Sequence, residues 1–220
     1  MTYTVEPTRI TPLRPAHPVR EWANAKFFGS IDWYMHRRLG ASKQVLLADL
    51  PPVVVELGAG AGASMRYLAP GTRLVAIEPN QHAHDALQRK AARYGIDLDI
   101  RSVRAEATGL ATESVDAVIC TLVLCTVDDQ AAALAEVHRI LRPGGRFVFI
   151  EHVKSDPGPL RALQRLVFRP WRFVFDGCRL DRDTASAIEA TGFAAVQLER
   201  GRLGGMFVPV WPQISGVAVA

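Results

Sequence analysis

Three glycines at every second position, preceded by an acid, form the most informative chemical pattern in this 220-residue sequence. The β-branched run Val53-Val54-Val55-Glu56-Leu57 leads directly into Gly58-Ala59-Gly60-Ala61-Gly62. Glycine allows a tight turn and brings bare backbone N–H groups against a ligand. A second apolar run, over residues 73–77, ends on Glu78, where a carboxylate can accept hydrogen bonds from a ribose diol. The pattern predicts a nucleoside-binding β–turn–α–β unit.

The glycine spacing differs from that of a dinucleotide site. That site uses G-x-G-x-x-G and places a pyrophosphate on a helix N-terminus. Here the pattern is E-x-G-x-G-x-G, and the third glycine comes one residue early. It resembles the first motif of class I S-adenosylmethionine-dependent methyltransferases, whose ligand carries no phosphate. The resemblance implies S-adenosyl-L-methionine as cofactor, with its methionine half over the glycine turn and its ribose at Glu78.

The same resemblance implies cofactor contacts at the carboxyl ends of the first four strands. These residues are Glu56, Gly58, Ala59, Gly60, Gly62, Glu78, Pro79, Ala105, Glu106 and Thr121. Such methyltransferases often place an acid after the third strand to accept a hydrogen bond from the adenine amino group. Arg104 stands at that position here, so either Glu106 takes the role or the backbone around Ala105 contacts the ring. The alternative for Glu106 is a solvated loop carboxylate.

Strand and helix patterns alternate along the chain. Strands are predicted at 53–57, 73–77, 98–103, 115–121 and 146–151, with helices from the glycine turn to about 68, at 81–94 and at 128–141. A helical stretch over about 19–50 precedes them. They are followed by a short helix at 184–191 and by two closing strands, 193–199 and 214–220. Five β-then-α units predict a doubly wound parallel sheet.

Together with the resemblance, this order implies an α/β, Rossmann-like class I methyltransferase fold. Its seven-stranded sheet is mostly parallel, has helices on both faces, and ends on an antiparallel strand. We expect a helical cap over residues 1–50 and a methyltransferase domain over 51–220, with a lid insertion at about 153–183. The helical stretch of the cap is expected to close over the cofactor and the acceptor.

A narrower resemblance links the sequence to the thiol S-methyltransferases known from animal membranes. It rests on Cys120-Thr121-Leu122-Val123-Leu124-Cys125-Thr126-Val127, Leu141-Arg142-Pro143-Gly144-Gly145, Glu151-His152-Val153, Asp176-Gly177-Cys178-Arg179-Leu180, Ala41-Ser42-Lys43 and Pro209-Val210-Trp211-Pro212. Animal members carry an N-terminal hydrophobic anchor, whereas residues 1–20 here are polar and proline-rich. The resemblance implies methyl transfer to a small, largely apolar acceptor, preferably a thiol, and the polar start leads us to expect no such anchor here.

Methyl transfer from a sulfonium is an in-line displacement, so the enzyme mainly aligns the reactants and excludes water. A thiol, with a pKa of about 8.5, needs little further activation, whereas an alcohol needs a strong base. His152 directly follows the fifth strand and is the candidate catalytic base. The alternative is a structural histidine. The expected acceptor pocket comprises Tyr34, Leu124, Cys125, His152 and Trp171.

The sequence predicts no metal site. His82 and His84 lie two residues apart, without the i,i+4 spacing of a helical metal pair. Asp176 and Cys178 have no companions nearby in the sequence, and Asp176 is expected to pair with Arg179 or Arg172.

The three cysteines cannot all pair with one another, so we expect reduced thiols and a cytoplasmic protein. Cys120 and Cys125 are interpreted mainly as small buried hydrophobes.

Residues 153–182 hold seven basic and three acidic side chains, a balance that accounts for the chain's net charge of +4. We favour a lid over a lipophilic small-molecule acceptor. The alternatives are contact with a membrane surface through 157–182, an RNA-facing patch, and a plain covering helix. No nucleic-acid partner is expected, and no apolar run approaches the ~18–20 residues that an integral membrane segment needs.

Two other functions remain open. One is an O- or C-methyltransferase of secondary metabolism. The other is a non-catalytic cofactor-binding or partner protein, against which the intact glycines and Glu78 argue, because a retired site need not keep them.

Overall fold

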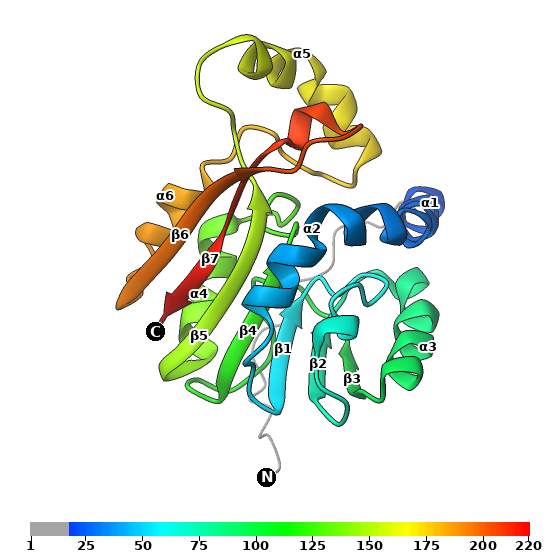
Figure 1. Cartoon of the computed structure of the whole chain (residues 1–220), viewed down its shortest axis with the longest axis vertical. Helices are drawn as coiled ribbons and strands as arrows, with labels where there is room; N and C mark the ends of the chain where they lie inside the picture. Colours follow the sequence, from blue (N-terminus) through cyan, green and yellow to red (C-terminus); the bar gives the residue numbers. More distant parts are fainter. Residues whose placement is uncertain (1–17) are drawn as a thin grey trace.

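The computed structural model describes residues 18–220. The expectations for the proline-rich start of the cap fall on residues 1–17 and so lie outside the described residues. The rest forms one sheet flanked by helices, with the carboxyl ends of the parallel strands pointing toward α5 (Figure 1).

The sheet has seven strands in the order β3-β2-β1-β4-β5-β7-β6. Their bounds are β1 Val53–Leu57, β2 Arg73–Ile77, β3 Asp97–Arg101, β4 Val115–Thr121, β5 Leu141–His152, β6 Ala195–Arg202 and β7 Pro212–Val219. Strands β1 to β5 pair in parallel, whereas β7 is antiparallel to both β5 and β6. The predicted seven-stranded, mostly parallel sheet is confirmed.

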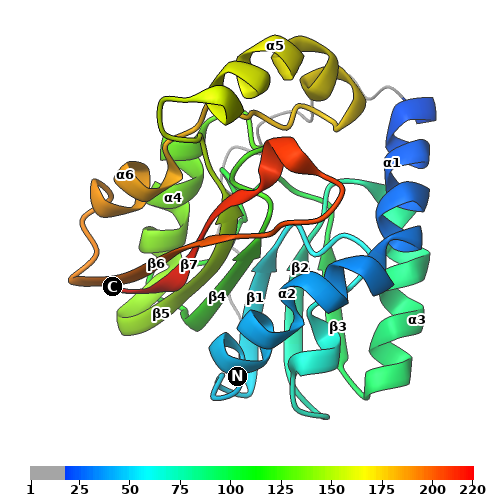
Figure 2. The same cartoon turned by 45° about the horizontal axis from the view of Figure 1, so that its top comes forward.

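Helices cover both faces of the sheet (Figure 2). They are α1 Pro18–Ser30, α2 Asp32–Leu46, α3 His84–Tyr94, α4 Gln130–Ile140, α5 Pro159–Val174 and α6 Thr184–Glu189, with 3-10 turns η1 Met65–Tyr67, η2 Gln81–Ala83 and η3 Val208–Val210. Leu134 of α4 and Ile188 of α6 pack with Phe149 on one face, and Leu87 of α3 packs with Leu74 on the other. Burial of the central strands on both sides explains the apolar run Ala117–Cys120 of β4.

The predicted helix after the glycine turn is wrong. Only the 3-10 turn η1 forms there, because Gly58, Gly60 and Gly62 all have positive φ and Pro70 follows soon after. Few residues are left for a helix between them. Leu47, just after α2, packs with this face of the sheet and supplies apolar cover there.

The predicted helix over 19–50 is two helices rather than one. Gly29 and Ser30 end α1, and the Ser30 hydroxyl donates to the Phe27 carbonyl at 2.7 Å. Such a Gly-Ser pair is a usual place for a helix to break. As a result α1 and α2 take separate directions, and the Asn80 side-chain amide donates to the Glu21 carbonyl of α1 at 3.0 Å.

Strand β5 begins at Leu141, five residues earlier than the predicted start at Arg146. Leu141 pairs with Val115 ahead of the Pro143-Gly144 turn, so the ladder continues across an irregular register. The third strand is Asp97–Arg101 rather than 98–103, and the two closing strands also differ from their predicted bounds by a few residues.

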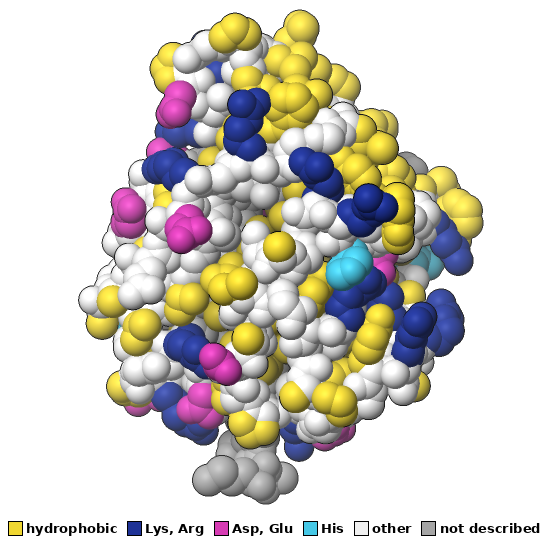
Figure 3. Space-filling model, in the orientation of Figure 1, with side chains coloured by type: hydrophobic (Ala, Val, Ile, Leu, Met, Phe, Trp, Pro, Cys, Tyr) yellow, Lys and Arg dark blue, Asp and Glu magenta, His cyan; other side chains and the backbone are white. Residues whose placement is uncertain are grey.

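Helix α5 lies across the carboxyl ends of the strands, where the lid was predicted (Figure 2). Its buried Gln164 donates to the carbonyls of Val153 and Pro209 and accepts from the Ser155 N–H, which fixes the helix to the sheet edge. On the opposite side, Leu166 and Phe173 are 80% and 69% exposed, and hydrophobic side chains gather over this end of the molecule (Figure 3). Contact with a membrane surface through 157–182 stays a prediction.

Among residues 18–220, no helix combines the length and the apolar character needed to cross a bilayer.

Gly216 in β7 tests how tightly the antiparallel strand fits. A Cβ there would overlap the backbone carbonyl oxygen of Gln197 in β6, whereas a Cβ on Gly201 in β6 would meet nothing within 4 Å. We expect Gly216→Ala to lower the free energy of unfolding by about 1–3 kcal/mol or more, because backbone cannot move aside cheaply. The matched variant Gly201→Ala should stay within about 0.5 kcal/mol of the parent. Equal losses in urea titrations of the two variants would contradict this.

Candidate active site

The carboxylate of Glu78 lies buried at the end of β2, directly against the glycine turn. Its Oε2 accepts from the Gly60 N–H at 2.7 Å and its Oε1 from the Asn80 N–H at 2.8 Å. Burial raises the pKa of Glu78, and the two N–H donors oppose that rise. The structure thus brings together the acid and the turn that the sequence motif links.

The three glycines of the turn have different reasons for lacking a side chain. A Cβ on Gly58 would come within 2.5 Å of the Val123 side chain, and one on Gly62 within 3.1 Å of the Met65 sulfur. A Cβ on Gly60 would meet only a backbone oxygen, at 3.9 Å. Gly58 and Gly62 are therefore needed for packing, and Gly60 is the glycine that faces open space.

Glu56, at the carboxyl half of β1, shares a buried polar cluster with two residues that the sequence reasoning did not assign. Lys43 of α2 is only 5% exposed and donates from Nζ to Ser64 Oγ at 3.0 Å. Burial lowers the Lys43 pKa and raises that of Glu56, while the attraction between their charges opposes both shifts. The one available signal for Lys43 was its place in the Ala41-Ser42-Lys43 motif.

Beyond β3, Glu106 is held by the loop that leads into α4. Its Oε1 accepts from the Asp128 N–H at 2.8 Å and the Asp129 N–H at 3.2 Å, and Arg104 forms an ion pair with it at 3.2 Å. Burial would raise the Glu106 pKa, but the Arg104 guanidinium and these N–H groups hold it below its usual value. Ala105 beside it is buried.

The carboxyl ends of β4 and β5 are joined through Glu151, which is fully buried. Its Oε1 accepts from the N–H groups of Val123 at 2.8 Å and Leu124 at 3.1 Å, and from the Cys120 thiol at 3.4 Å. Burial raises the Glu151 pKa against the effect of the two N–H donors. Leu124 itself is wholly buried, and Thr121 is partly exposed at the strand end.

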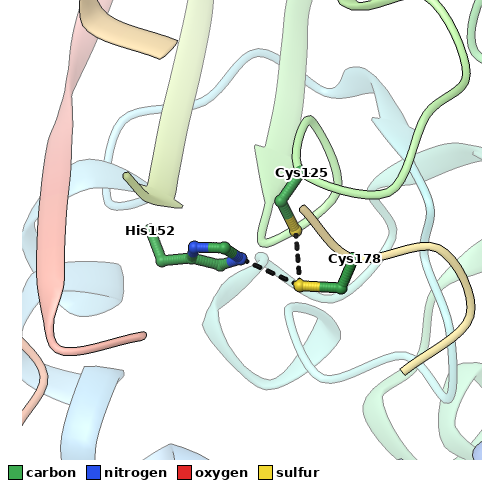
Figure 4. Close-up of side chains that lie close together, drawn as sticks. All are labelled: Cys125, His152 and Cys178. Atoms are coloured by element: carbon green, nitrogen blue, oxygen red, sulfur yellow. Dashed lines mark hydrogen bonds between the residues drawn. The ribbon is translucent and has the colours of Figure 1, made fainter. Parts of the chain in front are cut away.

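Next to this carboxylate, His152 lies between the two remaining cysteines and β7 (Figure 4). Its Nε2 is 3.1 Å from Cys178 Sγ, and Cys178 Sγ is 3.7 Å from Cys125 Sγ. Trp171 of α5 donates from Nε1 to Cys178 Sγ at 3.3 Å. The interpretation that Cys178 has no metal-ligating residue near it is wrong. The loop after β4, the end of β5 and the segment after α5 converge here and bring Cys125 and His152 to it.

The three side chains of this cluster shift one another's pKa values. The hydrogen bond between Cys125 and Cys178, supported by His152, holds the Cys178 pKa well below its usual value, and the Cys125 pKa is correspondingly raised. Burial lowers the His152 pKa, but the Cys178 sulfur outweighs it and leaves that pKa raised. Of the two sulfurs, that of Cys178 is therefore the one that loses its proton more readily.

The predicted acceptor residues fall into two groups. Cys125, His152 and Trp171 lie together, as described. Tyr34 of α2 instead accepts from the Met206 N–H through its Oη at 2.9 Å and packs on Phe207, with ring centroids 5.9 Å apart. It joins α2 to the loop between β6 and β7.

The remaining titratable residues singled out in the sequence take other positions. Asp176 pairs with Arg20 of α1 at 3.2 Å, so the expected partners Arg179 and Arg172 are wrong, since Arg179 pairs with Asp181 at 3.1 Å. His84 Nε2 lies 2.9 Å from the Glu78 carbonyl oxygen. His82 lines an open cavity of about 480 Å³ that borders α1, α3 and the glycine turn.

Substitutions in the Lys43–Glu56 pair test how much these two buried charges stabilise the fold beneath the glycine turn. We expect Lys43→Met to lower the free energy of unfolding by about 3–5 kcal/mol, because Glu56 is left buried without its partner. The double variant Lys43→Met/Glu56→Gln should recover most of that loss. Lys90→Met, which breaks the more exposed pair of Lys90 with Asp32, should cost about 1 kcal/mol or less. Equal stability of the single and double Lys43 variants in urea unfolding would rule out the coupling.

Comparison with known proteins agrees with this geometry. Residues 55–149 match a family described as "Methyltransferase domain". Human thiol S-methyltransferase TMT1B is 38% identical over 184 residues, which cover 82% of this chain and 72% of that protein. Human thiol S-methyltransferase TMT1A is 36% identical over 170 residues, covering 76% of this chain and 70% of that protein.

A solved structure shows the same fold. The Burkholderia thailandensis 1,6-didemethyltoxoflavin-N1-methyltransferase, with bound 1,6-didemethyltoxoflavin and S-adenosylhomocysteine, superposes with a TM-score of 0.64 at 20% identity, covering 95% of this chain and 92% of that one. The turn, the acid after β2, the sheet order and these relatives lead to one conclusion. The chain belongs to the class I S-adenosylmethionine-dependent methyltransferases, in the family of the thiol S-methyltransferases, and is an enzyme that uses S-adenosyl-L-methionine.

Proposed function

We propose that this enzyme methylates the sulfur of a small, largely apolar thiol. The observation that carries the proposal is the identity of 38% to human thiol S-methyltransferase TMT1B over most of both chains. The free thiols of Cys120, Cys125 and Cys178 support the related expectation of a reducing, cytoplasmic location.

The acceptor site proposed here lies at the carboxyl ends of β4 and β5, under α5. Val167, Phe168 and Trp171 of α5 pack toward Ile150 and Leu180, so the covering helix turns an apolar face to this edge. Apolar walls favour an apolar acceptor and exclude water from the displacement. We place Leu124, Cys125, His152 and Trp171 in this site, with Tyr34 at its outer end, where it joins α2 to the loop between β6 and β7.

Methyl transfer to a thiol requires little from the protein beyond alignment of the acceptor sulfur with the methyl group. The thiol loses its proton, the sulfur attacks the methyl carbon in line with the sulfonium, and S-adenosylhomocysteine leaves. At pH 7 a thiol with a pKa of about 8.5 is ionised to a fraction about 30-fold larger than a phenol with a pKa of about 10. A general base is therefore less necessary for a thiol than for an oxygen acceptor, so the proposal does not require His152 to act as one.

For the cofactor, we assign the ribose diol to Glu78 and the sulfonium half to the open space over Gly60. The buried carboxylate of Glu78 and the absence of neighbours around a Cβ on Gly60 support this placement. Oε1 of Glu106 already accepts from Arg104 and two backbone N–H groups, whereas each oxygen of Glu78 has one N–H donor. We therefore assign the adenine contact to the backbone around Ala105 rather than to the Glu106 carboxylate.

An acceptor panel tests the substrate class. At pH 7 we expect kcat/KM for thiophenol to exceed that for phenol by well over the roughly 30-fold that the ionised fractions give for an ordinary thiol, because an aromatic thiol is more acidic than an aliphatic one; benzoate should be inert. Methyl transfer is measured as S-adenosylhomocysteine formed, with mass spectrometry of the product. Turnover of phenol or benzoate without turnover of thiophenol, or of thiols in general, would overturn the sulfur assignment and leave an O-methyltransferase.

The raised pKa of Glu78 predicts how cofactor affinity depends on pH. Only the ionised carboxylate accepts from both ribose hydroxyls, so affinity should fall as pH drops through the Glu78 pKa, at a higher pH than for an ordinary glutamate. Glu78→Gln should weaken S-adenosylhomocysteine binding by about 10- to 150-fold, from the loss of about 1.5–3 kcal/mol, and abolish that pH dependence. Calorimetric titration of both proteins decides this. An unchanged affinity in a folded variant removes Glu78 from the cofactor site.

A further inference from the structure

One group of side chains in the described part of the chain brings three metal-ligating atoms together. Cys125, His152 and Cys178 each offer one atom, all three atoms lie within 4.8 Å of one another, and all three residues are buried. They come from the loop after β4, the end of β5 and the segment after α5. Figure 4 shows the two sulfurs and the imidazole nitrogen converging on one point.

The distances suit a tetrahedral zinc ion. With Zn–S bonds of about 2.3 Å and a Zn–N bond of about 2.0–2.1 Å, two sulfur ligands stand about 3.8 Å apart, and sulfur and nitrogen about 3.5 Å. The Cys125 and Cys178 sulfurs are 3.7 Å apart, and His152 Nε2 is 3.1 Å from Cys178 Sγ. The Cys125 sulfur and the His152 nitrogen lie within 4.8 Å of each other, so a movement of the imidazole toward Cys125 would complete the geometry.

The surroundings supply what such ligands usually need. The Trp171 N–H already points at the Cys178 sulfur at 3.3 Å. A zinc-bound histidine usually donates its other N–H to a second group. His152 Nδ1 is buried without a hydrogen-bond partner, and so is the side-chain nitrogen of Gln213, the residue directly opposite His152 on β7. Opposite residues share a face of the sheet, so a turned Gln213 amide is a candidate acceptor for the Nδ1–H.

The charge balance also fits. A zinc ion, two thiolates and a neutral imidazole are neutral together, so the cluster can be buried without an uncompensated charge. The nearby charged residues have other partners: Glu151 accepts from backbone N–H groups, and Arg182 donates to the carbonyls of Leu124 and Val127. Arg182 is thus occupied elsewhere, whereas Oε2 of Glu151 is buried without a hydrogen-bond partner.

We propose that Cys125, His152 and Cys178 bind one zinc ion whose fourth coordination position takes the sulfur of the acceptor thiol. Three protein ligands and one open position are the arrangement of a catalytic zinc site. The proposal extends to chemistry at the acceptor edge and rests on the proposed function for the identity of the fourth ligand. The ligand set is soft, which favours a thiolate over a phenolate.

The step balances without a redox partner. The acceptor thiol binds the metal and releases its proton to solvent. Its sulfur then uses an electron pair to form the new S–CH3 bond, while the bond between the methyl carbon and the sulfonium breaks and leaves its electron pair on S-adenosylhomocysteine. The neutral thioether is a weaker ligand than a thiolate and is displaced by water. His152, bound through Nε2, is a ligand in this scheme and not a general base.

Metal content is the first test. Zinc is measured by mass spectrometry of the full chain purified without chelators, with the protein reloaded under reducing conditions. We expect about one zinc per chain in the parent protein, as for a stoichiometric site, and less than about a tenth of that in Cys125→Ser, His152→Ala and Cys178→Ser. Cys120→Ser is the matched control, because Cys120 is a buried cysteine on the same edge that bonds to Glu151 instead. It should keep its zinc.

Cobalt provides a readout that does not depend on the folding of a variant. Co²⁺ loaded into the parent protein should show a thiolate-to-cobalt charge-transfer band and the visible bands of a four-coordinate site. Thiophenol should shift these bands and phenol should not. A parent protein that retains no zinc and shows no such band overturns the site, as does a Cys125–Cys178 disulfide that persists under reducing conditions. A cobalt spectrum unmoved by thiophenol overturns the acceptor at the fourth position.

The outcomes separate the two proposals. Zinc bound at the three residues in an enzyme that methylates no thiol would leave the metal site and remove the thiol function. Thiophenol methylated at full rate by metal-free protein would leave the function and overturn the binding of the acceptor sulfur to the metal.

Discussion

The loop between β4 and α4 depends for its position on one buried carboxylate. Glu151 accepts the N–H groups of Val123 and Leu124, so the loop after β4 is held against the end of β5. Arg182 then satisfies the carbonyls of Leu124 and Val127 from the other side. A buried loop is costly unless its backbone groups are paired, and these two side chains pair them. Cys125 is positioned as a consequence.

The same loop connects the carboxyl end of β4 to the glycine turn. The Val123 side chain fills the space beside Gly58, where a Cβ would come within 2.5 Å of it. A movement of this loop would therefore displace the glycine turn, because Val123 and Gly58 are in direct contact. Close packing in protein interiors makes such contacts effective, because there is little free volume to absorb a shift.

Three glutamates on three parallel strands show how burial adapts one residue type to different tasks. Glu56, Glu78 and Glu151 lie at or near carboxyl ends of β1, β2 and β5, and burial raises the pKa of each. The groups that oppose this rise in pKa differ: it is mainly Lys43 for Glu56, and backbone N–H groups for the other two glutamates. Glu78 lies directly against Gly60 of the turn, whereas Glu151 is fully buried between the loop after β4 and the end of β5.

Much of the fold was accessible from local pattern. The apolar runs of β1, β2 and β4 and the glycines after β1 act over a few residues, so the sequence by itself determined the cofactor motif and the class of sheet. The helix predictions were wrong where backbone conformation, rather than the pattern of apolar residues, determined the structure. Positive φ at three glycines prevented a helix before Pro70, and the Gly29-Ser30 pair divided the first helical stretch in two.

Only the tertiary structure decided which distant side chains meet. Cys125, His152 and Cys178 lie on separate segments, and no local spacing reveals that these converge under α5. The same holds for Lys43, which is buried against Glu56 because α2 packs on the sheet face that the missing helix leaves uncovered. Sequence patterns report burial and backbone conformation over one or two turns. Contacts between elements depend on how strands are ordered and how helices cross them, which is set by packing of the whole core.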